Sequence, residues 1–464
     1  MASPRNVTRG VIHQFLAATI ASISVIILGT SLGWPSPVLP KLEETGIPIR
    51  LTNSEISWMV SLLYLGNLAS PIPSGLLMDK FGRKNSLLLL SIFPVCAWIM
   101  ILYATKAYLL YIARFLAGVW SGTVSTIVPM YLAEISEPKI RGALSTFIQI
   151  MTNFGVLYEY IIGPLVSYYI LAIISGIIPI IFAILFVFMA ESPYWLLMKK
   201  KRDKAIKSLT WLRDIKDKTK IEEELNILTA VIDEEMNNKK SYKDIIRTKG
   251  NRKGLIIVEA LAILQRMSGI SALMAYTSTT LPKEGVGILT PNDCVIVMGI
   301  TWVICVFIAT ILVDSLGRKP LLIFSSIGCT FAMFIAGLWF FIDEKTIIDV
   351  KTLSWLPFAA FIFYGICFSI GLGPIASTIQ GELFPTNVKG IASGITSIIL
   401  ALTSFIMNKI YHSIAEIAGM YLNYWIFAIA SLISTIFVIF YVFETKGKTL
   451  AEIQEKLNKN VIDL

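Results

Sequence analysis

One charged motif occurs twice in this sequence and could form ion pairs at two matching places. It is Asp-x-x-Gly-Arg-Lys, present as Asp79–Lys84 and again as Asp314–Lys319. Each copy is a short basic loop that joins one long apolar segment to the next. A pattern that recurs at half the chain length indicates that one half of the chain duplicates the other.

A second charged motif recurs in the same order. Glu134-Ile-Ser-Glu-Pro-Lys-Ile-Arg141-Gly in the first half corresponds to Glu382-Leu-Phe-Pro-Thr-Asn-Val-Lys389-Gly in the second. Opposite charges at matching places predict salt bridges at one face of the protein. Partly solvated pairs contribute on the order of 1 kcal/mol each. A network of such pairs can therefore stabilise one conformation of the protein and still be broken when the conformation changes. The alternative is that these charges only anchor loops at the membrane interface.

Arg266 is an ionisable residue inside an apolar stretch. It lies about twelve residues into the segment 254–279, which is roughly 18 Å along a helix. A charge at that depth normally faces a cavity or a partner. Glu259 shares its helix face and could be an indirect partner, so a structural ion pair stands as the alternative to a role in substrate binding or gating. A cationic cavity would favour a solute with a carboxylate or phosphate group.

The composition places these charges in a membrane protein. The chain has 464 residues, of which 55% are hydrophobic and 15% charged, and its mean hydropathy is +0.71. A soluble chain would carry about 25% charged residues, and each spanning helix needs about 20 apolar residues. We therefore predict an all-α membrane protein with about twelve transmembrane helices. The predicted spans are about 11–33, 55–77, 86–104, 108–131, 143–163, 166–189, 254–279, 293–313, 321–342, 356–379, 390–411 and 420–443.

Lysine and arginine in the loops predict the orientation. With the N-terminus inside, most of the 40 basic residues fall in cytoplasmic segments, as the positive-inside rule requires. Both termini are then cytoplasmic, and we expect a plasma-membrane location. The predicted units are an N-terminal six-helix bundle (1–190), a cytoplasmic linker with short helices that steadies the two halves (191–253), a C-terminal six-helix bundle (254–443) and a cytoplasmic tail (444–464).

Residue usage argues against several other classes of protein. The five cysteines lie in or at the edge of apolar segments without metal or redox spacing, and there are only two histidines, so we expect no metal site and no cofactor. There is no Walker A motif, and no nucleophile–base–acid group can be assembled, so neither a primary pump nor an enzyme is expected. The basic residues cluster in loops between spans, which does not indicate nucleic-acid binding.

Three further stretches complete a family pattern. Glu191-Ser-Pro-Tyr-Trp-Leu follows the sixth predicted span, and Glu444-Thr-Lys-Gly-Lys-Thr-Leu follows the twelfth. Gly29-Thr-Ser-Leu-Gly-Trp-Pro-Ser-Pro-Val-Leu-Pro40 ends the first. With the two repeated motifs, they make the chain resemble the sugar porters of the major facilitator superfamily, and within them the facilitated trehalose and glucose transporters.

The resemblance implies two pseudo-symmetric six-helix bundles with a substrate cavity between them near the bilayer midplane. It also implies an intracellular gate made of salt bridges. The gate residues are Asp79, Arg83, Glu134, Arg141 and Glu191 in one half, and Asp314, Arg318, Glu382, Lys389 and Glu444 in the other. Lys389 replaces an arginine of the family and cannot make a planar bidentate pair.

The resemblance also assigns cavity positions, several of which carry unusual residues. Gln149 and Gln265 match sugar-contacting glutamines, whereas Arg266 replaces the second glutamine of the family's Gln-Gln-Leu-Ser-Gly-Ile-Asn motif. Leu400 and Ala401 stand where the trehalose transporters have Asn-Trp. Each lost hydrogen bond to a sugar costs on the order of 1 kcal/mol, so ordinary glucose or trehalose specificity is not implied. The expected substrate-binding residues are Gln149, Gln265, Arg266, Ser271, Trp302 and Ser377.

The first predicted span contains no Asp or Glu, whereas the proton-driven sugar porters that this chain resembles carry an acidic residue there. We therefore expect facilitative transport of a hexose or trehalose-like sugar by alternating access, as passive uniport. The alternatives are proton or sodium coupling through Glu259 or Glu159, another polar or anionic solute held by Arg266, and a non-transporting nutrient receptor. The expected partners are a small solute and the lipid bilayer, with a monomer sufficient and the oligomeric state open.

Overall fold

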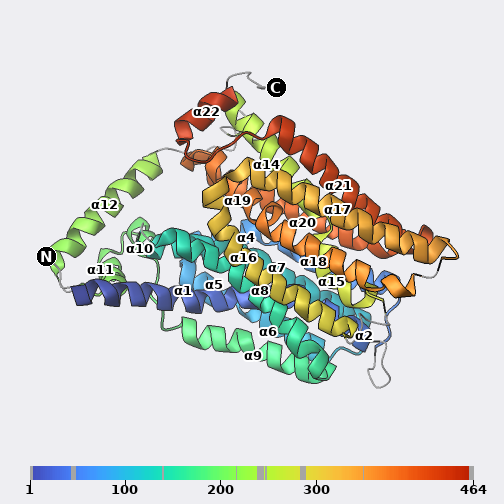
Figure 1. The fold of residues 1–464 in the computed structure, drawn as a ribbon. Coiled ribbons are helices and arrows are strands. Elements are labelled where there is room, and N and C mark those ends of the chain that lie inside the picture. The colour runs from blue at the N-terminus through green and yellow to red at the C-terminus, as the bar shows by residue number, and fades with distance from the viewer. Residues whose placement is uncertain are drawn as a thin grey trace.

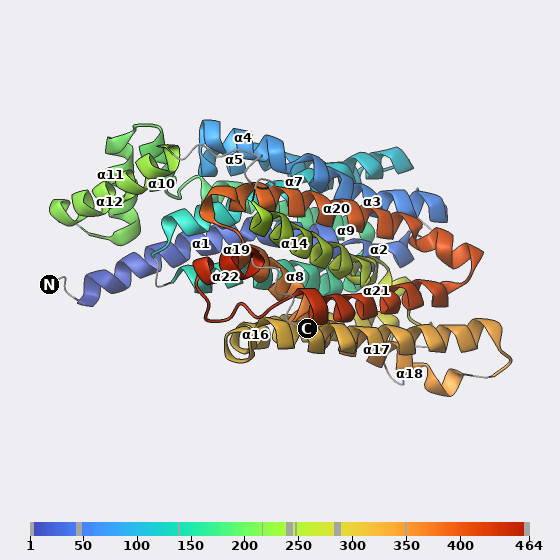
Figure 2. The same cartoon turned by 90° about the horizontal axis from the view of Figure 1, so that it is seen from above.

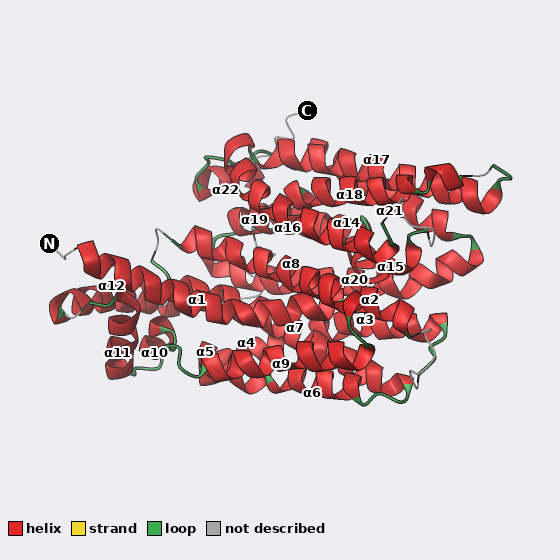
Figure 3. Ribbon diagram, turned by 60° about the horizontal axis from the view of Figure 1, so that its bottom comes forward, coloured by secondary structure: helices red, strands yellow, loops and turns green. Residues whose placement is uncertain are grey.

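The computed structural model describes residues 4–42, 49–137, 140–215, 217–237, 245, 248–282, 289–348 and 350–458. The described residues are almost entirely helical and contain no β-strand (Figure 3). Figure 1 shows long helices lying side by side, with α10–α12 and the N-terminus at the left end and α2 at the right.

The first half of the chain, blue to cyan-green in Figure 1, supplies the helices of one bundle. They are α1 (Pro4–Gly33), α2 (Pro35–Lys41), α3 (Asn53–Ala69), α4 (Pro71–Phe81), α5 (Arg83–Leu90), α6 (Ile92–Leu102), α7 (Ala107–Ile135), α8 (Arg141–Leu165) and α9 (Tyr168–Phe186).

The second half, yellow-green to red, supplies the other bundle, and shorter helices come between the two halves in the sequence and at the end of the chain (Figure 2). Those of the second bundle are α14 (Lys249–Met267), α15 (Ile270–Thr280), α16 (Pro291–Leu316), α17 (Arg318–Lys345), the 3₁₀ turn η1 (Lys351–Leu353), α18 (Trp355–Ile370), α19 (Leu372–Leu383), α20 (Thr386–Ile417) and α21 (Met420–Tyr441). The shorter helices are α10 (Pro193–Met198), α11 (Arg202–Arg213), α12 (Lys218–Asn237) and α22 (Leu450–Asn458).

The helices account for the predicted spans. Among the described residues, 10 helical segments are long and apolar enough to cross a membrane, and α3 with α4, bent by 45° at their junction, makes an eleventh. The more amphipathic α8 packs against α1 and α16, and it corresponds to the remaining predicted span, 143–163. The prediction of an all-α membrane protein with two six-helix bundles is confirmed.

Several spans are broken where proline or glycine interrupts the backbone hydrogen bonds of the helix. The second span breaks before Pro71, and the tenth breaks at Gly371, which separates α18 from α19. Proline lacks a backbone donor and glycine adds backbone freedom, which accounts for both breaks. The seventh span also breaks, at Gly269, which the sequence analysis did not anticipate.

The helices outside the membrane each attach to one half. α10, α11 and α12 share a small apolar core that includes Trp195, Leu209 and Leu225. Arg213 of α11 donates to the backbone oxygen of Ile135 in α7 at 2.9 Å, which fixes this unit to the first half. α22 instead packs against α14 and α19 of the second half. The helices α10–α12 are therefore packed on the first bundle.

Candidate functional site

Arg83 is at the centre of an ion-pair cluster in the first half. Its guanidinium contacts Glu134 through Nη2 at 2.8 Å and Nε at 3.1 Å, and Asp79 through Nη1 at 3.6 Å. The Arg83 side chain is 2% exposed and that of Glu134 is 11% exposed, so the pair is withdrawn from bulk water. It ties the loop between α4 and α5 to the end of α7.

Glu191 completes this cluster from the chain that follows α9. Its carboxylate accepts hydrogen bonds from the backbone N–H groups of Arg83 and Lys84, each at 3.0 Å. These are the first N–H groups of α5 and have no acceptor within the helix. A negative charge is also favoured at this end by the helix dipole. Glu191 therefore caps α5.

The second half repeats this geometry. Arg318 contacts Glu382 at 2.9 Å through Nη2 and at 3.1 Å through Nε, and Glu444 accepts from the N–H groups of Arg318 and Lys319 at 3.0 Å each. Burial tends to raise the pKa of Glu444, but backbone hydrogen bonds from Arg318, Lys446 and Lys319 outweigh it and lower that pKa below its ordinary value. Glu444 is thus held ionised as the cap of α17.

The glycine of each motif is required by these caps. Gly82 has φ +101° and Gly317 has φ +92°, in the region that side chains rarely adopt. A Cβ atom on Gly82 would also lie 2.2 Å from Glu191 Oε2, and one on Gly317 would lie 2.7 Å from Glu444 Oε2. Glycine therefore lets the carboxylate reach the helix end.

Three other predicted gate residues have no ion pair that the structure describes, and the side chains of two of them lie outside the described part of the structure. Arg141 begins α8 and Asp314 lies in α16, but their side chains are not among those that the structure describes. Lys389 is exposed on α20, close to Gly381 of α19. The carboxylates that Arg83 and Arg318 bind belong in each case to the same half as the arginine.

Contacts between the halves occur at the end that carries α2 and α15. The Tyr160 hydroxyl of α8 donates to the backbone oxygen of Met274 in α15 at 2.9 Å. Asn53 of α3 donates to Glu416 of α20 at 2.7 Å. α2 also packs against α15, and α8 against α16. This end of the interface is closed.

Two broken spans meet at Gln265, in the last turn of α14. Its Nε2 donates to the backbone oxygens of Leu372 at 2.6 Å and Gly373 at 3.0 Å, where α19 begins. The amide thus satisfies carbonyl groups beside a helix break, which a membrane would leave without partners. Directly after α14, Gly269 turns the chain with φ +98°, and a Cβ atom there would lie 2.4 Å from the ring of Phe427.

Arg266 lies beside this break. It is partly buried, and its Nε atom is sealed from solvent without a hydrogen-bond partner. The phenol groups of Tyr64 and Tyr364 lie within electrostatic range of its guanidinium. Glu259, considered above as an indirect partner, instead accepts a hydrogen bond from Thr396 at 2.7 Å. Among the described side chains, no carboxylate forms an ion pair with Arg266.

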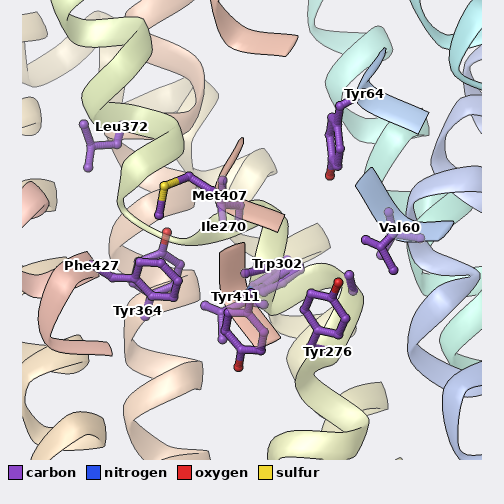
Figure 4. Close-up of a cluster of buried hydrophobic side chains, with 14 of the residues drawn as sticks. Val60, Tyr64, Ile270, Tyr276, Trp302, Tyr364, Leu372, Met407, Tyr411 and Phe427 are labelled. Carbon is purple, nitrogen blue, oxygen red and sulfur yellow. The ribbon is translucent and has the colours of Figure 1, made fainter. Parts of the chain in front are cut away.

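Ser271 and Asn408 place further polar atoms beside Tyr64, which is also a neighbour of Arg266. Ser271 Oγ and Asn408 Oδ1 are buried and have no hydrogen-bond partner. The Tyr64 hydroxyl lies next to both side chains. Figure 4 shows Tyr64 facing a group that includes Ile270, Tyr364 and Met407 across the interface. Tyr64 belongs to the first half and the others to the second.

Tyr64 and Asn408 were not predicted from the sequence. Their only signal is that each is a polar side chain inside an otherwise apolar segment, where such groups are costly and often functional. That signal is shared by many residues of the chain. Tyr64 and Asn408 become candidate site residues only because α3 packs against α20 and brings them together.

The other predicted cavity residues have different surroundings. Trp302 is 2% exposed, and its indole fills the space beside Gly365, where a Cβ atom would lie 1.7 Å from Nε1. The Ser377 hydroxyl donates to the backbone oxygen of Pro374 at 2.7 Å, and Gln149 is exposed on α8. In this structure Trp302 is part of the packed core, and Ser377 is bonded to its own helix.

Two buried charges in the first half lie close to one another without direct contact. Arg114 donates to the backbone oxygens of Ser31 at 2.6 Å and Met59 at 3.3 Å. Glu159 accepts a hydrogen bond from Ser175 at 2.7 Å, and its other oxygen has no partner. Arg114 is within electrostatic range of Glu159. The described residues include no group of three or more His, Cys, Asp or Glu side chains placed to hold a metal ion.

Comparison with known proteins gives one consistent result. A family model described as "Sugar (and other) transporter" matches residues 17–457. The facilitated trehalose transporter Tret1 of Polypedilum vanderplanki is 32% identical over 446 residues, covering 96% of this chain and 88% of that protein. Its namesake from Aedes aegypti is also 32% identical, but this chain spans only 55% of that longer protein.

Solved structures with the same arrangement are also known. The inward-open xylose transporter XylE from E. coli has a TM-score of 0.78 at 22% identity, covering 96% of this chain and 99% of that one. XylE bound to 6-bromo-6-deoxy-D-glucose, described as a major facilitator superfamily proton:xylose symporter, has a TM-score of 0.73 at 21% identity over 97% of this chain and all (100%) of that one. At this level of identity the likeness establishes the fold.

Proposed function

Because the chain belongs to the sugar transporter family of the major facilitator superfamily, we propose that it carries a sugar across a membrane by alternating access, without a coupled ion. The observation that carries this proposal is the pair of matching clusters around Arg83 and Arg318. Each cluster joins elements of one bundle only, which suits a carrier whose halves rock about a central site.

We assign the end with α10–α12 and α22 to the cytosol, as the loop charges favour. The end with α2 and α15 then faces outward and is closed, and from this we infer an inward-facing state. In the outward-facing state, the Arg83 and Arg318 clusters approach one another and close the inner end. This assignment is supported by Tyr160 and Asn53, whose hydrogen bonds cross the interface at the opposite end.

Replacing Tyr160 by phenylalanine should shift this equilibrium toward the outward-facing state. The change removes one hydrogen bond between the halves, and such a bond in a membrane protein contributes about 0.6 kcal/mol on average, roughly threefold in population. Spin labels at Lys207→Cys on α11 and Ala451→Cys on α22, both exposed positions, report the distance between the inner ends of the halves.

The short-distance population between these labels should grow about threefold in Tyr160→Phe. Tyr108→Phe is the matched control, because Tyr108 is 54% exposed. If Tyr160→Phe and Tyr108→Phe give the same distance distribution, the Tyr160 hydroxyl does not hold the outer end closed.

The proposed transport is tested by flux into vesicles. The purified protein in liposomes should take up labelled glucose or trehalose at an initial rate that saturates with concentration. A nutrient receptor on the same scaffold would bind the sugar without flux above that of protein-free liposomes.

Passive uniport predicts that an uncoupler leaves this uptake unchanged, because α1 carries no carboxylate. Glu159 is the observation that favours proton coupling, since it is a fully buried carboxylate with one oxygen unpartnered. Uptake against a gradient that an uncoupler abolishes would overturn uniport. In that case, sugar uptake by the Glu159→Gln variant should no longer depend on the proton gradient.

A further inference from the structure

We propose that the sugar carried by this protein bears a carboxylate, and that Arg266 binds that group at the break in the seventh span. The inference rests on the sugar transport proposed above and specifies the class of substrate. The chemistry that would recognise such a solute is a cation together with neutral hydrogen-bonding groups for the hydroxyls.

The first observation is a cation deep in the protein without an anionic partner. Arg266 lies within the membrane-spanning segment Lys249–Thr280, and its Nε donor is buried and unused. Among the described residues, its electrostatic neighbours are the phenols of Tyr64 and Tyr364. Neither phenol supplies a negative charge at neutral pH. A guanidinium in this setting matches a carboxylate in shape and charge.

The second observation is the helix break itself. α15 begins at Ile270, directly after the left-handed turn at Gly269. The first N–H groups of a helix lack internal acceptors and carry a partial positive charge. Arg266 and the start of α15 are four residues apart in sequence, on either side of this turn, so each favours an anion near the helix break.

The third observation is a set of neutral polar groups nearby. Ser271 Oγ and Asn408 Oδ1 are buried without hydrogen-bond partners, and the Tyr64 hydroxyl lies next to both side chains. Burying such groups is costly unless a partner is present. Sugar hydroxyls can donate to all three oxygens and accept from the hydroxyls of Ser271 and Tyr64. Because Tyr64 comes from one half and the others from the opposite half, a solute here would be held between the bundles.

A neutral sugar would leave the Arg266 guanidinium without an anionic partner, whereas a sugar acid would neutralise it. The probes that separate these cases are D-glucuronate and D-glucose, which differ by a carboxylate in place of a hydroxymethyl group. In liposomes containing the full-length protein, D-glucuronate should have the lower KM of the two.

Arg266→Gln should reverse that preference. Removing one partner of a buried charge pair weakens binding strongly, so the ratio of the glucuronate KM to the glucose KM should rise roughly 100-fold. Arg266→Lys, which keeps the charge but loses the planar fork, should fall between the two proteins. Reading the ratio rather than the rate makes the result independent of how much of each variant is folded.

A measurement on the unaltered protein does not depend on any variant. Uniport of an anion moves charge, so an inside-positive potential of about 100 mV should raise glucuronate accumulation roughly 50-fold and leave glucose unaffected. If glucose has the lower KM, glucuronate flux ignores the potential and Arg266→Gln leaves the KM ratio unchanged, the proposal is wrong while sugar transport stands. Absence of saturable flux for both solutes would overturn both proposals.

Discussion

Replacing Arg83 by alanine should destabilise the protein more than any other single change in the two charged clusters. The pair with Glu134 is withdrawn from water, and Glu134 Oε2 is already without a hydrogen-bond partner. Removing the guanidinium leaves a buried carboxylate uncompensated, which costs about 3–5 kcal/mol. The variant should therefore melt at a lower temperature in detergent and give less monodisperse protein on size-exclusion chromatography.

Two variants test the cause of that loss. Arg318→Ala removes the matching side chain of the second half, but Arg318 is 13% exposed and Glu382 is 26% exposed, so water compensates part of the change and the loss should be smaller. Adding Glu134→Gln to Arg83→Ala removes the stranded charge and should recover part of the melting temperature. If Arg83→Ala melts no lower than Arg318→Ala, burial of the first pair does not matter as argued.

Gly269→Ala should have the second largest effect and should impair transport as well as stability. The residue has φ +98°, and its new Cβ atom would lie 2.4 Å from the ring of Phe427. Left-handed backbone costs about 1–2 kcal/mol for a residue with a side chain, and an overlap in a packed core adds about 1–3 kcal/mol. Because this turn orients α14 against α15, relief of the strain would change the position of Arg266 in α14 relative to Ser271 in α15.

The matched control is the same methyl group added at Gly394 of α20, where nothing lies within 4 Å and φ is ordinary. Gly394→Ala should keep the melting temperature and the initial uptake rate of the unaltered protein. Phe427→Leu, combined with Gly269→Ala, should relieve the overlap but not the backbone strain. If Gly269→Ala transports as fast as Gly394→Ala, the turn is not needed in its observed form.

The fold could be predicted from the sequence because its main signals are local or repeated. Runs of about 20 apolar residues mark the spans wherever they lie in the chain. The Asp-x-x-Gly-Arg-Lys motif occurs twice, so each copy supports the other, and its partners Glu191 and Glu444 follow the sixth and twelfth spans in the same way. What the motif did not reveal is that the glycine admits the capping carboxylate to the helix end.

The central site could be predicted only in part, because it depends on packing between distant segments. Arg266 was found by its depth in an apolar segment and its departure from the family motif, and Ser271 lies in that same short stretch. Tyr64 and Asn408 lie far apart in the sequence and meet only because α3 packs against α20. Trp302 aligns with a cavity position and its indole lies against Gly365, so its role in substrate binding stays a prediction.

The most direct test of the account is counterflow in liposomes that contain the purified protein. The vesicles are loaded with unlabelled solute and diluted into a trace of the same labelled solute, with glucose, trehalose and glucuronate tested in turn. A carrier that alternates between two faces returns loaded, so the label should accumulate transiently above equilibrium for at least one of the three. A label that only equilibrates would indicate a channel, and a label that stays outside with monodisperse protein would indicate a receptor. Either result would contradict alternating access.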